Sequence, residues 1–324
     1  MKNRIIELAK RLDADIVGFA PASRFEKDDA IFKIFPNVKT VIGLAFRVLR
    51  GAYRCVEEGT TYYQYTTMGV ENLEETVMPQ SLVCISNLIE EEGYEAIPQR
   101  KNPFIMKDKE KTDPEVDYRD IRHGIEAENQ MDFLDAAVMC GLGERSMINS
   151  LLTKEFGPFV RYCFILTDAE IEPTPLCLPS LCDKCGECIK ACHGKAISDN
   201  GSIDTWRCAV YYNGANGSKN PFLPPDAYLG FENRLDIING TAEFDTDGAK
   251  DILDNTYFYP PVKNLYSGSM CGRACDRACY IHLERKGVLT RKFNKQFREK
   301  EDWKLSTKQF ETLRPEKVWE FTKG

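Results

Sequence analysis

Residues 182–192 read Cys182-Asp-Lys-Cys185-Gly-Glu-Cys188-Ile-Lys-Ala-Cys192, four cysteines with the spacing Cys-x2-Cys-x2-Cys-x3-Cys. Bacterial proteins use this spacing to hold 4Fe-4S clusters. The two-residue gaps let the chain curl around one cluster with three thiolates, while the fourth thiolate points towards a second cluster. Zinc sites more often use two separated cysteine pairs, with no third cysteine two residues later. The run therefore predicts iron–sulfur clusters rather than zinc.

Four further cysteines bring the number of ligands to the eight that two clusters need. Cys208 stands alone, and a three-cysteine run with the spacing Cys-x3-Cys-x3-Cys begins at residue 271. The crossover rule of two-cluster ferredoxins then assigns each cysteine to a cluster. The first cysteine group is Cys182, Cys185, Cys188 and Cys279, and the second cysteine group is Cys192, Cys208, Cys271 and Cys275. His193 and Tyr280 take the place of the proline that usually follows each run. His193 could be a ligand, but with eight thiolates present we expect it to replace the turn proline.

Composition and charge indicate a soluble globular protein. The chain has 324 residues, of which 43% are hydrophobic and 29% charged, and it is long enough for two domains or for one domain with an insert. A net charge of −7 argues against a broad nucleic-acid-binding surface. The sequence has no export leader and no long apolar run, so we expect a cytoplasmic protein with no membrane span. Low-potential clusters favour a reducing, anaerobic cytosol. Five more cysteines are expected to be reduced core thiols: Cys55, Cys84, Cys140, Cys163 and Cys177.

Apolar periodicity predicts alternating helices and strands before the cysteine run. We expect helices over residues 3–12 and 72–92, with Gly93 ending the second, and a short helix just before Gly141. Strands are expected over residues 15–20, 38–46, 94–97 and 160–166, and an exposed loop over 107–120. The tyrosines of residues 53–66 either line a ligand pocket or, more commonly, pack in the core.

Gly141-Leu142-Gly143 suggests a dinucleotide-binding motif, which we reject. The third glycine position holds Ser146, and the motif follows a helix instead of a strand.

One block of sequence, together with the order of the cysteines, resembles a known group of enzymes. The block runs from Ala136 to Glu144, continues with Asn149 and with Leu151 to Arg161, and ends at Asp168. It resembles cobalamin-dependent epoxyqueuosine reductases and reductive dehalogenases, in which a similar block precedes a four-cysteine run, a lone cysteine and a three-cysteine run. The similarity covers residues 10–100 and, more closely, 130–210. It fades over 213–265 and returns at 271–279.

This resemblance implies an α/β (α+β) fold in which a flavin-reductase-like or nitroreductase-like core cups a corrinoid. The expected domains are a corrinoid-binding core over 1–170, a ferredoxin-like two-cluster module over 171–285 with an insert at 213–265, and a basic C-terminal tail over 286–324. The clusters would relay electrons to a cobalamin whose lower base is detached. The residues expected to contact the cobalamin are Gly141, Leu142, Gly143, Glu144, Asn149, Leu152, Thr153, Phe156, Gly157 and Arg161.

The sequence also departs from the epoxyqueuosine reductases. Their Val-Asp-x-x-Pro stretch, which carries the expected proton donor, has no match here. Glu126 or Glu128 could serve as the acid if burial raised its pKa, although an acidic helix start in solvent is the commoner role for such residues. We therefore expect a reductase of an unidentified small molecule, supplied with electrons by a ferredoxin or flavodoxin, and we do not expect tRNA binding. The alternative is an electron-transfer protein or reductive activator that serves a separate corrinoid enzyme.

Two further segments carry expectations. Seven basic residues lie between Arg285 and Lys300, interleaved with Phe293 and Phe297. They could bind an acidic redox partner or tRNA, but a cationic amphipathic helix packing on the core is the commoner case. The insert at 213–265 is rich in turn residues, with a short helix expected around 249–253. We expect the insert to cap the substrate pocket.

Overall fold

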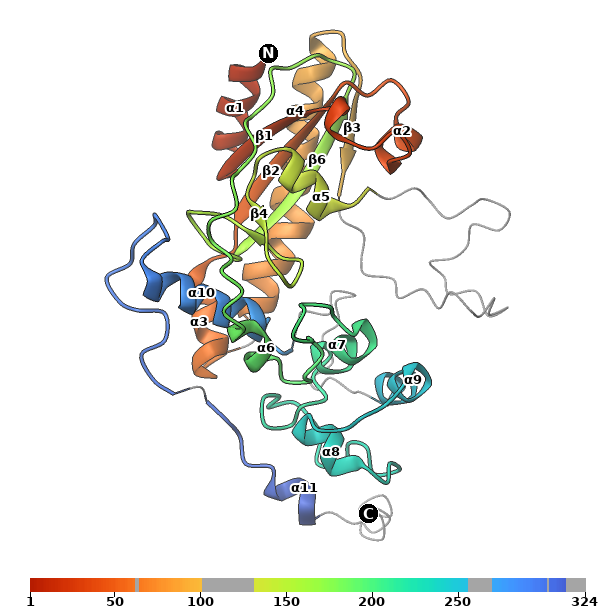
Figure 1. The fold of residues 1–324 in the computed structure, drawn as a ribbon, viewed down its shortest axis with the longest axis vertical. Helices are drawn as coiled ribbons and strands as arrows, with labels where there is room; N and C mark the ends of the chain where they lie inside the picture. Colours follow the sequence, from red (N-terminus) through yellow and green to blue (C-terminus); the bar gives the residue numbers. More distant parts are fainter. Residues whose placement is uncertain (62–63, 101–130, 256–269, 302, 313–324) are drawn as a thin grey trace. The chain divides into compact units, whose positions relative to one another are not determined.

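The computed structural model describes residues 1–61, 64–100, 131–255, 270–301 and 303–312 (Figure 1). These residues form a mixture of helices and strands, as the α/β class requires. The chain divides into two compact units. Unit 1 comprises residues 1–46, 77–143 and 162–178, and unit 2 comprises 47–76, 144–161 and 179–324.

Unit 1 is built on a four-stranded sheet with the strand order β1-β2-β6-β3. The strands are β1 (Ile16–Pro21), β2 (Thr40–Arg47), β3 (Ala96–Gln99) and β6 (Val160–Thr167). The last residue of β2 and the first two of β6 belong to unit 2. β1 pairs with β2, and β3 with β6, in antiparallel fashion. β2 is apolar and buried over nearly its whole length, which is typical of a strand covered on both faces.

Helices α1 (Lys2–Arg11) and α4 (Met78–Glu91) pack against each other in unit 1. The Ser81 hydroxyl of α4 donates to the carbonyl of Leu12 at 3.0 Å, so it joins α4 to the end of α1. Three shorter helices complete this unit: η1 (Ala22–Arg24), α2 (Ala30–Ile34) and α5 (Phe133–Met139). The predicted helix at 3–12 and the predicted strands at 15–20, 38–46 and 160–166 are confirmed close to their expected bounds.

The predicted helix over 72–92 is regular only from Met78. It is preceded by two π-helical segments, η2 (Tyr65–Glu71) and η3 (Leu73–Val77). Gly93 has φ +85°, which suits the residue that follows a helix. The loop expected at 107–120 lies outside the described residues.

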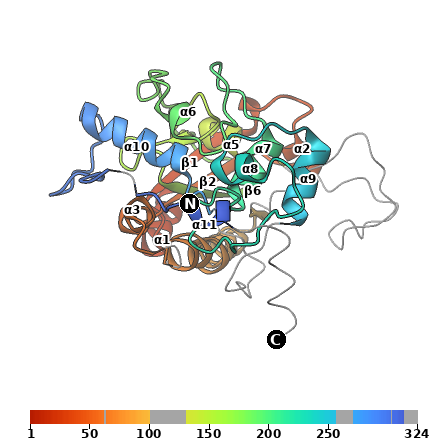
Figure 2. The same ribbon diagram turned by 90° about the horizontal axis from the view of Figure 1, so that it is seen from below.

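Unit 2 contains α3 (Arg50–Glu58), the hairpin strands β4 (Glu144–Arg145) and β5 (Leu151–Leu152), and helices α6 to α11. These helices are α6 (Glu187–Ala191), α7 (Thr205–Tyr212), α8 (Arg234–Asn239), α9 (Thr246–Asp254), α10 (Ala274–Lys286) and α11 (Lys308–Thr312). α10 packs against α6 and α3. α7, α8 and α9 share a separate apolar cluster. Figure 2 shows the three helices from below.

An aromatic stack forms the core between α3 and α10. The rings of Tyr53 and Phe159 are 4.0 Å apart, and those of Phe159 and Tyr280 are 4.3 Å apart. Tyr53 and Tyr65 are fully buried, so these two tyrosines pack in the core.

The expected basic helix after residue 286 is not formed. α10 ends at Lys286 and is followed by Gly287, which has φ +70°, and residues 288–300 continue as bends and irregular chain. Phe297 is fully buried in the core of unit 2, whereas Phe293 is 44% exposed. In a helix these two side chains, four residues apart, would lie on one face and would be buried or exposed together. The irregular backbone allows one of them to be buried while the other stays exposed.

Candidate functional site

Three elements of unit 2 position the eight cysteines of the two groups. Cys182 and Cys185 lie in the loop before α6, Cys188 lies in α6, and Cys192 follows it directly. Cys208 lies in α7. Cys271 precedes α10, which carries Cys275 and Cys279. None of the thirteen cysteines, all of which fall within the described ranges, forms a disulfide.

The structure brings the members of the first cysteine group together. Burial raises the pKa of Cys279, and the charge of Asp276 adds to this effect. The thiolates of Cys182, Cys185 and Cys188 raise the pKa of Cys279 further. Burial also raises the pKa of Cys188, and the Cys185 and Cys182 thiolates contribute to that shift. Such mutual repulsion requires the four sulfur atoms to be neighbours.

The second cysteine group is brought together in the same way. Burial raises the pKa of Cys208 to about 12, with added repulsion from Cys271 and Cys192. Burial likewise raises the pKa of Cys275, on which the charges of Cys271 and Cys192 also act. The charges of Cys271 and Cys192 thus act on both Cys208 and Cys275, while the assignment of the eight cysteines to two clusters stays a prediction.

Backbone N–H groups point at two of these sulfur atoms. Met147 N–H donates to Cys182 Sγ at 3.4 Å, and Ala196 N–H donates to Cys192 Sγ at 3.3 Å. Hydrogen bonds of this kind stabilise a thiolate and tune the potential of a bound cluster. Cysteine binds metal as the thiolate, and a coordinated metal ion displaces the thiol proton. The donor set therefore fits an iron–sulfur cluster in each group.

The Glu144 carboxylate holds the start of the cysteine run. Its oxygens accept hydrogen bonds from three consecutive backbone N–H groups, those of Ser180 at 2.6 Å, Leu181 at 2.8 Å and Cys182 at 2.9 Å. The side chain is 5% exposed. The Glu144 carboxylate thus positions the first cysteine of the run, and the expected contact of this residue with a corrinoid stays a prediction. The spacing of the cysteines gives no sign of this role.

Other polar side chains of the 141–161 block also form hydrogen bonds or ion pairs with residues of this chain. Asn149 has φ +54° in the β4–β5 turn, a conformation that asparagine tolerates, and its side chain accepts from Arg145 at 3.0 Å. The Thr153 hydroxyl accepts from Phe156 N–H at 3.1 Å. Arg161 pairs with Glu74 at 2.7 Å.

The apolar and glycine residues of the block make tight turns and core contacts. Leu142, Leu152 and Phe156 are buried. Gly157 has φ +57° and lies against Leu283 of α10. The Gly141-Leu142-Gly143 turn belongs to unit 1, whereas residues 144–161 belong to unit 2. Glu126 and Glu128 lie outside the described residues.

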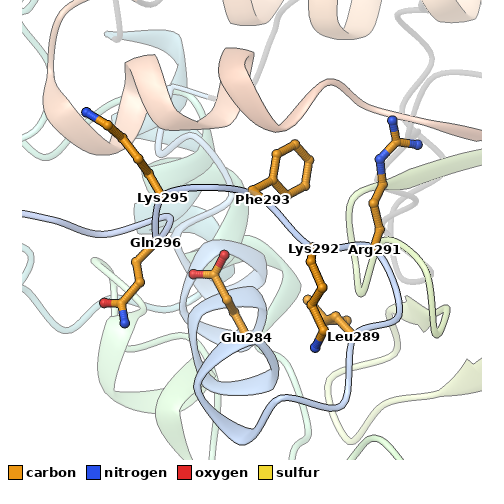
Figure 3. A pocket seen from close by; sticks show the side chains of 7 residues that line it. All are labelled: Glu284, Leu289, Arg291, Lys292, Phe293, Lys295 and Gln296. Atoms are coloured by element: carbon orange, nitrogen blue, oxygen red, sulfur yellow. The ribbon is translucent and has the colours of Figure 1, made fainter.

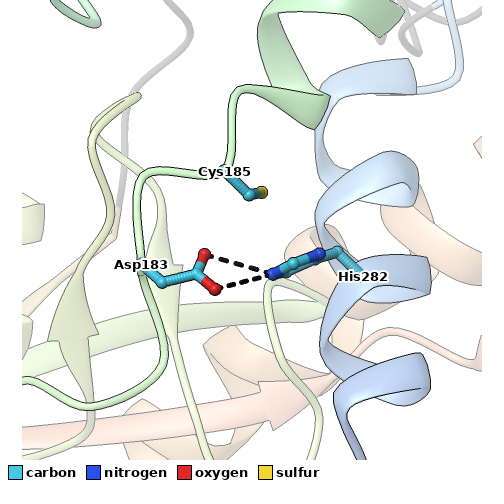
Figure 4. A group of neighbouring side chains, drawn as sticks. All are labelled: Asp183, Cys185 and His282. Carbon is cyan, nitrogen blue, oxygen red and sulfur yellow. Dashed lines mark hydrogen bonds and ion pairs between the residues drawn. The ribbon is translucent and has the colours of Figure 1, made fainter.

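Two polar groups beside the cysteines were not expected from the sequence. Asp276, 1% exposed, accepts from the Ser150 hydroxyl at 3.0 Å and from Arg273 Nε at 2.7 Å. Asp183 pairs with His282 Nε2 at 3.0 Å, next to Cys185 (Figure 4). Both groups join residues far apart in the sequence, so no local pattern could have revealed them. His193 lines, with Cys192, a polar cavity of about 400 Å³.

Comparison with known proteins gives structural similarity only. The sequence matches no protein-family model and no curated protein. The chain is similar to an epoxyqueuosine reductase from Bacillus subtilis, with 16% identity over 89% of this chain and 82% of the other and a TM-score of 0.44. It is also similar to the epoxyqueuosine reductase from Streptococcus thermophilus, with 14% identity over 86% and 80% of the two chains and a TM-score of 0.46. A catabolic reductive dehalogenase gives 16% identity over 93% of this chain but 38% of the other, with a TM-score of 0.46. These are the two kinds of reductase that the sequence motifs resemble.

Proposed function

We propose that the chain is an iron–sulfur oxidoreductase in which two 4Fe-4S clusters supply electrons to a bound base-off cobalamin for the reduction of a small molecule. The arrangement of eight thiols in two groups of four carries this proposal. The proposal further rests on the resemblance of the 136–168 block, and of the cysteine order, to cobalamin-dependent reductases. A nitroreductase-like core and a ferredoxin-like module are the corresponding domain assignments, with the division at 1–170, 171–285 and 286–324.

In this proposal the first cysteine group would hold one cluster and the second cysteine group the other. Glu144 would fix the backbone at Cys182, and the N–H groups of Met147 and Ala196 would stabilise the cluster thiolates. Backbone groups of residues 141–158 would contact the corrinoid. Bound cobalamin would supply low-valent cobalt as the reductant. Glu126 or Glu128 would donate the proton.

We further propose a cytoplasmic protein that takes electrons from a ferredoxin or flavodoxin. In the described part of the chain, no helix combines the length and the apolar character that crossing a membrane would demand.

The test is anaerobic purification and reconstitution with iron and sulfide, followed by incubation with cobalamin. About eight iron atoms per chain and a retained corrinoid with a base-off absorbance spectrum are the expected result. Cys208→Ser should lose or convert one cluster. Cys55→Ser, which changes a cysteine outside both groups, is the matched control and should keep both clusters. If Cys208→Ser also keeps two intact clusters, the proposed ligand set is wrong.

The second candidate function is an electron carrier or reductive activator without bound cobalamin. It is favoured by the internal engagement of Glu144, Asn149 and Arg161, which leaves these side chains committed to protein partners. Eight iron atoms with no retained corrinoid would support the carrier instead of the reductase.

A further inference from the structure

A basic surface lies at the end of α10 and in the segment that follows it. We define the basic surface as the side chains of Arg285, Lys286, Arg291, Lys292, Phe293 and Lys295, all of which are exposed. Residues 284–300 contain seven lysines and arginines but only two glutamates, whereas the whole chain has a net charge of −7. The local charge is therefore opposite in sign to that of the molecule.

Contacts within unit 2 fix the shape of this segment. Thr290 N–H donates to the Lys154 carbonyl at 2.8 Å, and Lys292 Nζ donates to the Gly287 carbonyl at 3.0 Å. The Glu284 carboxylate accepts from Phe297 N–H at 2.7 Å and pairs with Arg50 at 2.8 Å. The segment is thus attached along its length, and its cations are presented from an ordered backbone.

The cations surround an apolar centre. Phe293 lies 4.3 Å from the Arg50 guanidinium and 5.9 Å from that of Arg291. Next to it is a hollow of about 90 Å³, whose lining includes Leu289, Lys292 and Lys295 (Figure 3). An exposed aromatic side chain with a charged rim is the usual composition of a protein–protein contact site.

The basic surface adjoins the exposed side of the first cysteine group. α10 carries Cys279 and, three and seven residues later, His282 and Lys286. Lys286 Nζ pairs with Asp183 at 2.8 Å, and Asp183 in turn pairs with His282 beside Cys185 (Figure 4). Of the eight cysteines in the two groups, only Cys185 is exposed; the other seven are buried or partly buried.

From these observations we infer that the basic surface docks a small acidic one-electron carrier protein, which reduces the cluster of the first cysteine group. The inference rests on the proposed function for the presence of the clusters. In each encounter one electron passes from the reduced carrier to the cluster, so that the carrier is oxidised and the cluster reduced by one electron, with no bond made or broken. Cys185, the exposed ligand, lies on the side where the carrier approaches.

Charge complementarity selects an acidic partner. Opposite charges on two proteins raise the rate of association by about ten- to a thousandfold, and salt removes this gain. Phosphates would also be attracted, and a base could stack on Phe293, but a nucleic acid gains nothing from an exposed cluster ligand. A protein carrier uses the charge, the aromatic side chain and the nearby cluster together.

The test measures reduction of the reconstituted full-length chain by stopped-flow absorbance. The reductants are a photoreduced acidic flavodoxin, as the probe, and dithionite, which needs no docking surface. The variant is Arg285→Glu/Lys295→Glu, and the matched control is Lys308→Glu/Lys304→Glu, which makes the same charge change on exposed residues of unit 2 outside the basic surface. We expect the double variant to lower the second-order rate constant with flavodoxin about tenfold or more at low salt, to leave the dithionite rate unchanged, and to match the wild type at high salt. The control should stay within about twofold of the wild type.

Several results would overturn the inference. One is equal flavodoxin rates for the double variant and the wild type. Another is an equal loss in the control, which would mean that only total charge matters. If the double variant does not assemble its clusters, the salt dependence of the wild-type rate constant with flavodoxin is the test. A rate constant that does not fall as salt is added contradicts docking by charge. Tight binding of a tRNA that the double variant loses, with unchanged flavodoxin rates, would assign the surface to nucleic acid. Since only cluster reduction is measured, a chain that retains no cobalamin refutes the proposed reductase without affecting this test.

Discussion

Glu144 is a buried carboxylate beside the proposed cluster of the first cysteine group. Its two oxygens serve three consecutive N–H groups at the start of the cysteine run. A glutamine offers one acceptor oxygen, and its NH2 group would face an N–H donor. Each hydrogen bond to a charged group contributes about 1.5–3 kcal/mol.

We therefore expect Glu144→Gln to lower the thermal unfolding midpoint and to speed the loss of the first cluster to a chelator several-fold. The decay of iron–sulfur absorbance in the presence of the chelator measures this rate. Glu155→Gln, a change at an exposed glutamate of the same block, is the control and should behave like the wild type. A chelation rate for Glu144→Gln equal to that of the wild type would show that Glu144 does not support the cluster.

Among single residues, sequence reasoning could propose the cysteines as ligands because their spacing is itself the chemical requirement. It could not identify the role of Glu144, since a carboxylate that accepts backbone N–H groups leaves no periodic pattern. The same holds for Asp276 and Asp183, whose partners Ser150 and His282 lie about a hundred or more residues away.

Strand β1 and the turn after α5 approach each other so closely that one position requires glycine. A Cβ atom at Gly18 would lie 2.1 Å from the Cys140 carbonyl oxygen, which is backbone and cannot move aside as a side chain can. Gly18→Ala should therefore destabilise the protein by about 1–3 kcal/mol or more, as overpacking does. Gly51→Ala in α3 is the control, because nothing lies within 4 Å of its Cβ position. This control should be neutral or slightly stabilising, since alanine favours helices. Urea unfolding monitored by circular dichroism compares the two, and equal midpoints would contradict the close packing.

A buried ion-pair group holds the C-terminal segment against α3 and α10. Glu57, 3% exposed, accepts from Arg277 of α10 and from Arg298. Nearby, the Trp303 indole N–H donates to the Val56 carbonyl at 2.9 Å. These contacts, with the burial of Phe297, explain why residues 288–301 are irregular where charge patterning favoured a helix. We call this segment the strap.

Removing the Glu57 charge should release this strap. Glu57→Gln leaves two arginines without their carboxylate, and breaking a buried ion pair costs about 3–5 kcal/mol. We expect a lower unfolding midpoint and faster tryptic cleavage at residues 298–304, followed by mass spectrometry. The neighbouring Glu58→Gln disrupts only the partly exposed pair with Arg54 and should cost less than about 1 kcal/mol. Equal cleavage of the two variants would mean that Glu57 does not hold the strap.

For the chain as a whole, the sequence predicted unit 1 better than unit 2. Strands β1, β2 and β6 follow from continuous apolar runs, which are local signals. Unit 2 instead gathers segments 47–76, 144–161 and 179–324, and its aromatic stack joins Tyr53, Phe159 and Tyr280. Such long-range association is not encoded in periodicity. Only the cysteine count indicated that residues 182–192, 208 and 271–279 come together.

Removal of the clusters should therefore affect the two units differently. The thiol groups link α6, α7 and α10, so the cluster-free protein should lose amide hydrogen-exchange protection in these helices. The sheet strands β1 and β3 should keep their protection. Hydrogen exchange with mass spectrometry on the reconstituted and the cluster-free chain measures both. A uniform loss of protection over both units would show that the clusters do not act locally in unit 2.

The position of α10 in the chain has a consequence for biosynthesis. The ribosome completes the segment 182–192 well before it reaches Cys271, Cys275 and Cys279, and α10 also supplies Arg277 to Glu57. Until then the cysteines of residues 182–208 lack the remaining members of their two groups, and their thiols can be oxidised. In the proposed assignment each cluster takes at least one ligand from residues 271–279, so neither proposed cluster can be completed before that segment has been made.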